Sequence, residues 1–356
     1  MNKKTRRIIF YLFLTIFIIL VPLIIIYALG YTFDFDKKIL SSTGGIYLKS
    51  YPNDADIFLD DKAKRKTNRF ITHLKPKTYE VRVEKENYHS WKKQLTVEQK
   101  IVTKADNILL IPFNPKILLT ATNSKEYEDF FTEPYPKEIL NLIKRKSKYT
   151  IFNISNISLN NKGDKIYFLS NNNLYSLDLD KNNLEDSELS DKLISNVLKY
   201  IMYKNGILYL DYFTGKIFEL DLSSLKTAEV FDQVFPNLNQ CDWTLSTNNK
   251  KLLCKKYSSV EILWLERVAN NSIIRKKGDI EKIYFNQKIN DIIWHPKTDE
   301  HLIISTNDSI LITELDNREP RNTINFISTP LPEIQYNSKT ETLYFFSQNR
   351  LYETGL

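Results

Sequence analysis

The sequence predicts a mainly β protein with one N-terminal transmembrane helix, a small β-sandwich module and a C-terminal β-propeller of five or six blades. Three observations predict this fold class. No charged residue occurs from Ile8 to Phe33, apolar and polar residues alternate through much of 44–112, and a strand-rich pattern repeats after residue 150. The chain is also rich in tyrosine (21) and phenylalanine (20) and poor in glycine (8), a mix that favours half-buried strands.

A chain of 356 residues is long enough for two or three folded units. We expect a basic cytoplasmic tail at 1–7, a transmembrane helix at 8–30 and a linker at 31–43. A β module follows at 44–112, and the propeller occupies 150–356. Between them, 113–149 is a connecting segment or part of a first blade, with a short helix around Lys137–Lys144.

The apolar stretch from Ile8 to Gly30 predicts a membrane anchor. About 20 apolar residues cross a bilayer core, and this stretch meets that length. Four cations precede it and two aspartates follow it, so the positive-inside rule places the N-terminus in the cytoplasm and the later domains outside the plasma membrane. The alternative is a cleaved signal peptide ending near "ALG" at 28–30, but the apolar run is longer than a usual signal core.

Charge and cysteine content exclude two classes of function. The net charge is +7, but acids slightly outnumber bases after residue 112, so the large C-terminal part has no concentrated basic face for nucleic acid. The two cysteines, Cys241 and Cys254, form neither a disulfide framework nor a zinc spacing. They flank the turn "STNNKK", so a cross-strand disulfide and two separate thiols both remain open.

Alternation with period two in "GGIYLKSYPNDADIFLDDK" (44–62) and "YEVRVEKENYHSWKKQLTVEQ" (79–99) predicts four or five short strands. These residues resemble the PEGA domain, which implies an extracytoplasmic β module without a shared active site. The positions that match its pattern are Gly45, Ser50, Pro52, Ala55, Ile57, Leu59, Asp60, Thr67, Pro76, Tyr88 and Trp91.

Four positions where the PEGA pattern has glycine hold other residues, namely Asp54, Asp61, Lys77 and Asn87. Asp and Asn tolerate a positive φ better than other non-glycine residues. We therefore expect Asp54, Asp61 and Asn87 to substitute for glycine in tight turns, and Lys77 to suit such a turn less well.

Five repeats follow, and each has three strands separated by polar turns. Their apolar centres lie 41, 45, 50 and 41 residues apart, at Ile166, Ile207, Leu252, Leu302 and Leu343. Propeller blades repeat at about 40–50 residues. The turns "IWHPKTDEH" and "TLSTNNKKL" resemble WD-like, TolB-like propeller repeats, and residues 113–150 would supply a sixth blade or a closing strand.

No residues in the sequence form a recognisable catalytic, cofactor or metal motif. Asp54, Asp56 and Asp60 share a predicted strand face and its turns, which favours a solvated surface over a metal site. His295 and His301 flank a polar turn and would approach each other across a hairpin. Without a third ligand, two histidines are a weak metal signal, and we expect surface turn residues.

The basic run "KAKRKTNR" is the one candidate contact site. The run is interpreted either as a solvated hairpin loop or as a surface that contacts anionic wall polymer or lipid head groups. The cations are Lys62, Lys64, Arg65, Lys66 and Arg69.

We therefore expect a membrane-anchored, extracytoplasmic binding or scaffold protein of the cell envelope, not an enzyme, that presents a propeller to a cell-wall glycan or an envelope protein. The alternative is a polysaccharide-acting hydrolase built on the propeller, which requires paired carboxylates at the mouth of the channel.

Overall fold

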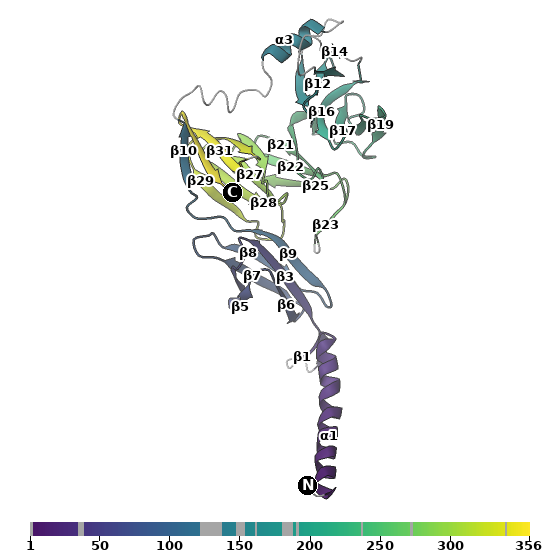
Figure 1. Ribbon diagram of the computed structural model, residues 1–356, viewed down its shortest axis with the longest axis vertical. Coiled ribbons are helices and arrows are strands. Elements are labelled where there is room, and N and C mark those ends of the chain that lie inside the picture. The colour runs from purple at the N-terminus through teal and green to yellow at the C-terminus, as the bar shows by residue number, and fades with distance from the viewer. Residues whose placement is uncertain are drawn as a thin grey trace. The chain divides into compact units, whose positions relative to one another are not determined.

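The computed structural model describes residues 3–34, 39–121, 137–146, 154–160, 162–179, 188–189, 192–235, 238–270, 273–338 and 340–356. The chain divides into two compact units. The first contains 1–115, 269–274 and 312–326, and the second contains 116–268, 275–311 and 327–356. Figure 1 labels many of the elements of both units.

The first unit begins with helix α1 (Lys3–Ala28), which is apolar and exposed along its length. It is the one helix among the described residues that is long and apolar enough to cross a membrane. A short hairpin follows, formed by β1 (Tyr31–Asp34) and β2 (Ile39–Ser42). The Thr43 hydroxyl donates to the Gly30 carbonyl at 2.6 Å, and the Tyr27 and His73 rings stack 4.2 Å apart. The end of the helix therefore contacts the base of the β module.

The module is a sandwich of two sheets with strand orders β6-β3-β9 and β5-β4-β7-β8. Its strands are β3 (Gly44–Tyr51), β4 (Asp56–Leu59), β5 (Lys62–Lys66), β6 (Arg69–Leu74), β7 (Thr78–Glu84), β8 (Trp91–Thr96) and β9 (Val102–Leu109). The alternating residues Ile57, Leu59, Val81 and Val83 are buried as predicted. The expected four or five strands were too few. The basic run 62–66, read as a loop, pairs with β4 as an edge strand, and the segment after it, β6, pairs with β3.

The predicted glycine substitutes have the expected backbone. Asp54, Asp61 and Asn87 have φ of 57°, 59° and 68°. Asp60 is also left-handed, so Asp60 and Asp61 form the two-residue turn that joins β4 to β5, with Leu59 opposite Lys62. Lys77, the least suited of the four, is not among the described residues with a positive φ.

A segment from the C-terminal half of the chain, 312–326, belongs to the first unit and covers the β8 edge of the module. The Gln94 amide donates to the Glu319 carbonyl at 2.8 Å, and Arg318 donates to the Lys104 carbonyl at 3.1 Å. Lys93 is fully buried here. Its Nζ lies 2.7 Å from Glu314 Oε1 and donates to the carbonyls of Asp316, Arg318 and Pro320.

The described residues of the second unit form five antiparallel sheets of four or five strands, which we call blades 1 to 5 in chain order. Blade 1 has β11 (Ser155–Leu159), β12 (Lys165–Ser170), β13 (Asn173–Asp178), β14 (Glu188–Leu189) and β15 (Ile194–Ser195). Blade 2 has β16 (Val197–Tyr203), β17 (Gly206–Asp211), β18 (Ile217–Asp221) and β19 (Lys226–Glu229). Blade 3 has β20 (Asp242–Leu245), β21 (Lys251–Lys255), β22 (Ser259–Trp264) and β25 (Ile280–Tyr284).

Blade 4 has β26 (Asp291–Trp294), β27 (His301–Ser305), β28 (Ser309–Glu314) and β29 (Thr323–Ser328), of which the ends at 312–326 group with the first unit. Blade 5 has β30 (Glu333–Asn337), β31 (Thr342–Ser347), β32 (Arg350–Gly355) and, from earlier in the chain, β10 (Ile117–Ala121). Figure 1 shows β10 alongside these C-terminal strands. Residues 117–121 therefore supply the closing strand of the last blade.

Three smaller elements complete the described chain: α3 (Lys137–Lys146), the hairpin β23 (Val268–Asn270) and β24 (Ile273–Arg275), and a 3-10 turn (Leu238–Gln240). Leu142 and Ile143 of α3 pack on Ile166 and Phe168 of blade 1. The rest of the predicted connection 113–149 lies partly outside the described residues.

The five predicted apolar centres occupy one position in the ladders of the five blades. Ile166, Ile207, Leu252, Leu302 and Leu343 each lie on the second strand, opposite Leu159, Met202, Leu245, Trp294 and Tyr336 of the first strand. Neighbouring blades pack through such residues, and one cluster joins blades 1 and 2 while another joins blades 2 and 3. The innermost strands of blades 1 and 2, of blades 2 and 3, and of blades 4 and 5 are in contact, as in a propeller.

Candidate functional site

The five predicted basic residues lie on the exposed edge of the module. Lys62, Lys64, Arg65 and Lys66 are on β5, and Arg69 begins β6, with all five side chains exposed. Lys62 is close enough to Asp60 to lower the pKa of that carboxyl, after the larger effect of the Lys77 hydrogen bond. The other four have no acidic partner within 4 Å among the described residues.

Cys241 and Cys254 form a disulfide in blade 3, with their Cα atoms 5.3 Å apart. The pairing, which the sequence left open, follows from the ladder. Cys254 on β21 lies opposite Trp243 of β20, and Cys241 directly precedes β20, so both cysteines come to neighbouring strands.

The prediction that His295 and His301 are surface residues is wrong. Both are buried, at 1% and 4% exposure, because they close the β26–β27 hairpin between packed blades. Their ring centroids are 6.1 Å apart, and the Lys297 amide donates to His295 Nδ1 at 3.4 Å. Burial, helped by the nearby Lys297 charge, lowers the pKa of His295 to about 4. No group of three metal-binding side chains occurs among the described residues, so His295 and His301 have no third side chain there with which to hold a metal ion.

A polar ring that sequence reasoning missed lies at the start of the inner strands. Asp242, Asp291 and Glu333 are the first residues of β20, β26 and β30. In each strand the acid lies three residues before the residue that pairs with the apolar centre of that blade. We call these three the inner-strand acids. In blade 2 the same position holds Lys199 on β16. Four successive blades therefore present Lys, Asp, Asp and Glu at one structural position.

Two lysines form hydrogen bonds from one blade to the start of the inner strand of the next blade. Lys199 of blade 2 donates to the carbonyl of Cys241, which directly precedes Asp242. Lys255 of blade 3 donates to the carbonyl of Asn290 at 3.1 Å, which directly precedes Asp291, and lies 3.4 Å from Asp242 Oδ2. Each lysine thus holds the start of the next inner strand in place, next to a carboxylate.

The ionisation of the ring is perturbed. Burial raises the pKa of Asp291, and the charges of Glu333 and Asp242 raise it further, against a hydrogen bond from the Ile292 amide and the charge of Lys255. Burial lowers the pKa of Lys199, and the charge of Asp242 opposes this. Asp291 is half-buried, whereas Asp242 and Glu333 are exposed.

Exposed aromatic side chains lie at the same end of the blades. In an antiparallel four-stranded sheet, the first strand begins at the end where the second turn lies and where the fourth strand finishes. Tyr212 and Phe213 are in the second turn of blade 2, Tyr257 is in that of blade 3, and Tyr284 ends the fourth strand of blade 3. Their exposures are 53%, 75%, 73% and 75%. The Ile289 amide donates to the Tyr257 carbonyl at 2.7 Å, which brings this turn to the segment that leads into Asp291.

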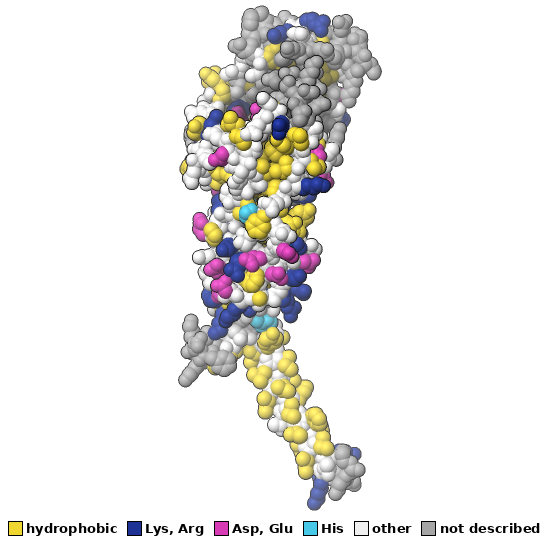
Figure 2. Space-filling view, turned by 90° about the vertical axis from the view of Figure 1, so that its left-hand side faces the viewer, with side chains coloured by type: hydrophobic (Ala, Val, Ile, Leu, Met, Phe, Trp, Pro, Cys, Tyr) yellow, Lys and Arg dark blue, Asp and Glu magenta, His cyan; other side chains and the backbone are white. Residues whose placement is uncertain are grey.

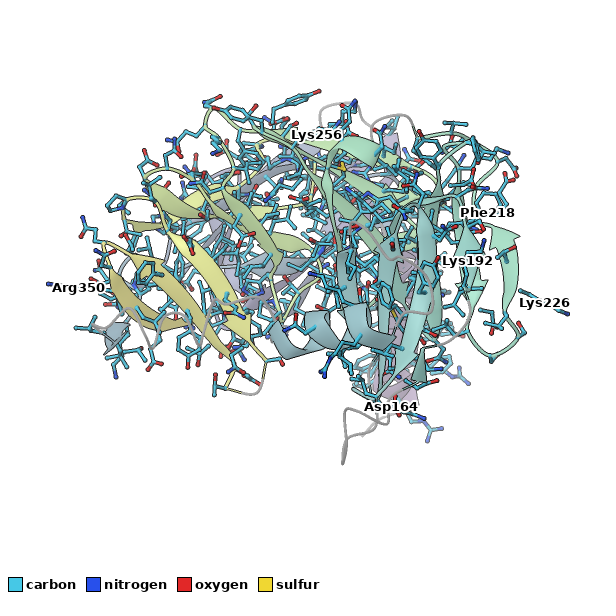
Figure 3. The ribbon with its side chains drawn as sticks, turned by 90° about the horizontal axis from the view of Figure 1, so that it is seen from above. Asp164, Lys192, Phe218, Lys226, Lys256 and Arg350 are labelled. Atoms are coloured by element: carbon cyan, nitrogen blue, oxygen red, sulfur yellow. A yellow bond between two sulfur atoms is a disulfide. The ribbon has the colours of Figure 1, made fainter. Side chains whose placement is uncertain are left out.

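Figure 3 shows the two ends of this unit. Lys256, next to Tyr257 in a second turn, and Asp164, in a first turn, lie at opposite edges of the view. Lys226 and Arg350 project outward from the sheets. The end that carries the inner-strand acids therefore combines carboxylates with exposed apolar rings, which together can hold a ligand with hydroxyl or amino groups by hydrogen bonds and ring contact.

A separate cavity of about 340 Å³ lies beside β25, lined by Gln233, Val234, Phe235, Leu238, Glu261, Gly278, Asp279, Ile280 and Lys282. Burial disfavours the charged form of Glu261, but hydrogen bonds from Lys256 and Lys282 outweigh it and lower the pKa of this carboxyl. Glu261 is thus a paired structural carboxylate and a poor proton donor.

The sequence did hold a signal for the inner-strand acids. Each begins a repeat at the same place, in "DWTLS", "DIIWH" and "EIQYN". Aligning the repeats on their apolar centres places the three acids in register, which the spacing of centres alone does not reveal.

Comparison with known proteins agrees with this description. Residues 43–109 match the model of the PEGA domain. No curated protein matches the chain. Among solved structures, the chain resembles the β-propeller domain of Cps50 (Swd1) from Myceliophteria thermophila, at 13% identity and a TM-score of 0.35, over 56% of this chain and 65% of that one.

It also resembles an inactive variant of virginiamycin B lyase from Staphylococcus aureus, at 11% identity and a TM-score of 0.36, over 59% of this chain and 72% of that one. A third similar structure is described as the extracellular domain of a hybrid two component system from B. thetaiotaomicron. It has 12% identity and a TM-score of 0.38, over 57% of this chain and 27% of that one. The chain thus spans only about a quarter of this last structure. At these TM-scores the likenesses carry no argument about function, and the propeller assignment rests on the sheet order and ladder register.

Proposed function

We propose that this protein is a membrane-anchored, single-pass, extracytoplasmic glycan-binding protein of the cell envelope, and that its propeller binds the glycan where the inner strands begin. One observation carries the proposal: the inner-strand acids Asp242, Asp291 and Glu333 and the exposed aromatic residues around Tyr257 lie at the same end of consecutive blades.

The proposed orientation rests on charge and on the disulfide. Lys4, Arg6 and Arg7 precede or begin the apolar part of α1, which favours a cytoplasmic N-terminus and a plasma-membrane anchor that is retained. The Cys241–Cys254 disulfide favours an oxidising compartment for the propeller, since disulfides are rare in the cytosol. A C-terminal tag that a protease outside intact cells can remove is the expected result, and protection of that tag until lysis would contradict the orientation.

Chemistry favours a glycan as the ligand. Aromatic side chains supply rigid apolar area at small entropic cost, which suits the C–H faces of sugar rings. Carboxylates accept hydrogen bonds from hydroxyl groups and pair with the amino groups of amino sugars. The exposed rings of Tyr257 and Tyr284 lie on blade 3, whose first strand begins with Asp242.

The test is a glycan array probed with the full chain in nanodiscs, followed by titration of the best binder. Tyr257→Ala is expected to weaken binding about tenfold, equivalent to about 1.4 kcal/mol. The control is Leu225→Ala, because Leu225 is 60% exposed in the third turn of blade 2, at the opposite end of the blade. An array without binders, or equal loss in both variants, would count against the proposal.

A second candidate, an envelope polysaccharide hydrolase, is favoured by one specific observation. The raised pKa of Asp291 beside the exposed Glu333 resembles the pairing of a proton-donating carboxyl with an ionised one in glycoside hydrolases. Reducing-end release from envelope polysaccharide, lost in both Asp291→Asn and Glu333→Gln, would establish it. Binding without turnover in the wild-type chain would leave only the binding function.

A further inference from the structure

The basic strand β5 is a one-dimensional row of charge on the open edge of a sheet. It pairs with β4 on one side, and the sheet order β5-β4-β7-β8 leaves its other side free. The register of β5 against β4 shifts between Ala63 and Lys66, so the cations of β5 lie on both faces of this edge and together form one basic row along the strand. Figure 2 shows Lys and Arg side chains on this side of the module, with Asp and Glu side chains among them.

The acids of the module do not neutralise this row. Asp60 pairs with Lys77, while Asp61 and Glu84 lie 3.2 Å and 3.0 Å from the Arg82 guanidinium. At the other edge of the same sheet, Lys93 is paired with Glu314. These pairs leave Lys64, Arg65, Lys66 and Arg69 without an acidic partner among the described residues.

The direction of the row follows from the strand register. Thr43, directly before β3, bonds to Gly30 at the end of α1, so β3 begins at the base of the module and runs away from the helix. Because β6 is antiparallel to β3, with Leu48 opposite Arg69 and Gly44 opposite Leu74, Arg69 lies at the end away from the helix. Strand β5 leads up to Arg69 from the two-residue turn at Asp60 and Asp61.

We propose that β5, together with Arg69, binds a linear, phosphate-bearing polymer outside the membrane rather than lipid head groups. The row extends about 13 Å along the strand, whereas the potential of an anionic bilayer decays within a Debye length of about 8 Å at physiological ionic strength. A flat head-group layer therefore reaches one end of the row, while a polymer chain can follow all of it. The proposal shares the extracytoplasmic orientation with the proposed function but is independent of the glycan site.

The competing explanation is that the cations only protect an open edge. Lysine on an edge strand prevents pairing with another chain, and it needs no ligand to do so. That explanation predicts self-association, and no change in polyanion binding, when the cations are removed.

The test measures fluorescent inorganic polyphosphate binding to the full chain in phosphatidylcholine nanodiscs. One variant combines Lys64→Gln, Arg65→Gln, Lys66→Gln and Arg69→Gln. A matched control with the same charge loss combines Lys49→Gln, Lys92→Gln, Lys226→Gln and Lys288→Gln, which are exposed elsewhere on the chain.

We expect the strand variant to bind at least tenfold more weakly and the control to change less than twofold. Binding of the wild type should also weaken with salt, with a slope that falls in the strand variant by roughly 0.7 for each lost contact. The four single Gln variants should show graded losses, which separates lost contacts from a failure to fold.

Three outcomes would overturn the proposal. The first is equal binding by both four-site variants, which means that total charge alone attracts the polymer. The second is unchanged polyphosphate binding with dimerisation of the strand variant, which means edge protection. The third is a strand-dependent gain of affinity on nanodiscs that contain phosphatidylglycerol, without polyphosphate binding, which means a lipid contact. Because the glycan assay uses a different ligand and different residues, either proposal can fail alone.

Discussion

Lys93 in the PEGA module and His295 in the propeller are both buried, at 0% and 1% exposure, but their surroundings differ. Lys93 has Glu314 at 2.7 Å and three backbone carbonyls around its ammonium group. His295 has no acid within ion-pair distance among the described residues, and one amide of its own turn donates to it. A buried cation needs partners, whereas a group that can lose its charge needs none.

The two units are therefore destabilised by different changes. The module depends on a pair that joins residues far apart in the chain, so removal of one partner leaves a buried charge alone. The propeller depends on the neutral form of an imidazole, so acid alone weakens it without any mutation. The predictions below test this contrast, beginning with the largest expected effect.

The largest effect is expected for Lys93→Met. The change leaves Glu314, which is 3% exposed, without its cation, and should lower the free energy of unfolding of the module by about 3–5 kcal/mol. Thermal unfolding of the full chain in nanodiscs, with hydrogen exchange to resolve the two units, measures it. Lys92→Met, one residue away and exposed, should change stability by less than about 0.5 kcal/mol.

A double variant tests the cause. Glu314→Gln keeps an acceptor for the Trp91 indole N–H, which bonds to Glu314 Oε2 at 2.9 Å, but removes the charge. Combined with Lys93→Met, it should recover part of the loss. No recovery would mean that Lys93 stabilises the module through packing and its carbonyl contacts rather than through the pair.

The next effect concerns the covalent link that only the propeller has. The Cys241–Cys254 disulfide closes a loop of 13 residues, which corresponds to about 3 kcal/mol of unfolded-state entropy. Cys241→Ala with Cys254→Ala should therefore destabilise blade 3 and leave hydrogen exchange in the module unchanged. Equal loss in both units would show that they unfold as one, and the contrast between them would not hold.

A fall in pH should lower the free energy of unfolding of the propeller by no more than removal of the disulfide does. Folding lowers the pKa of His295 from about 6.5 to about 4, so its contribution is fully present above pH 6.5 and is lost as the pH falls to 4. The maximum loss is about 3 kcal/mol. Hydrogen exchange between pH 7 and 4 measures it, and His295→Gln should abolish most of the dependence.

The module provides the internal control for this titration. Burial also lowers the pKa of His89, but its ring is half-exposed, so solvent reduces the effect on stability. A steeper pH dependence in the module than in the propeller would contradict the assignment to His295.

The smallest effect tests a feature that the two units share. Asn87 in the module and Asn249 in blade 3 have φ of 68° and 57°, a region that glycine occupies without strain. Asn87→Gly and Asn249→Gly should each change stability by no more than about 1 kcal/mol, in the stabilising direction. Asn107→Gly within β9, which has no positive φ, should instead destabilise by about 0.5–1 kcal/mol.

Some features were determined by the sequence alone because they depend on neighbours along the chain. The uncharged run predicts the apolar part of α1, and alternation predicts which residues of β4 and β7 are buried. Asp54, Asp61 and Asn87 take the left-handed backbone that their turns require. The repeat spacing likewise predicts the five repeats that became blades 1 to 5, because each repeat is a local meander whose apolar centre pairs with the same position of the strand before it.

Other features were decided only by the tertiary structure. The basic run became a strand because β4 offers it a partner, although its lysines have low strand propensity. The turn of His295 meets blade 3, where the Thr247 and Asn248 amides donate to Asp299 of that turn. Lys93 is buried because residues 312–326, more than two hundred positions later, return to the module. Local periodicity shows which face of a strand is apolar. It does not show which distant segment of the chain covers a polar residue.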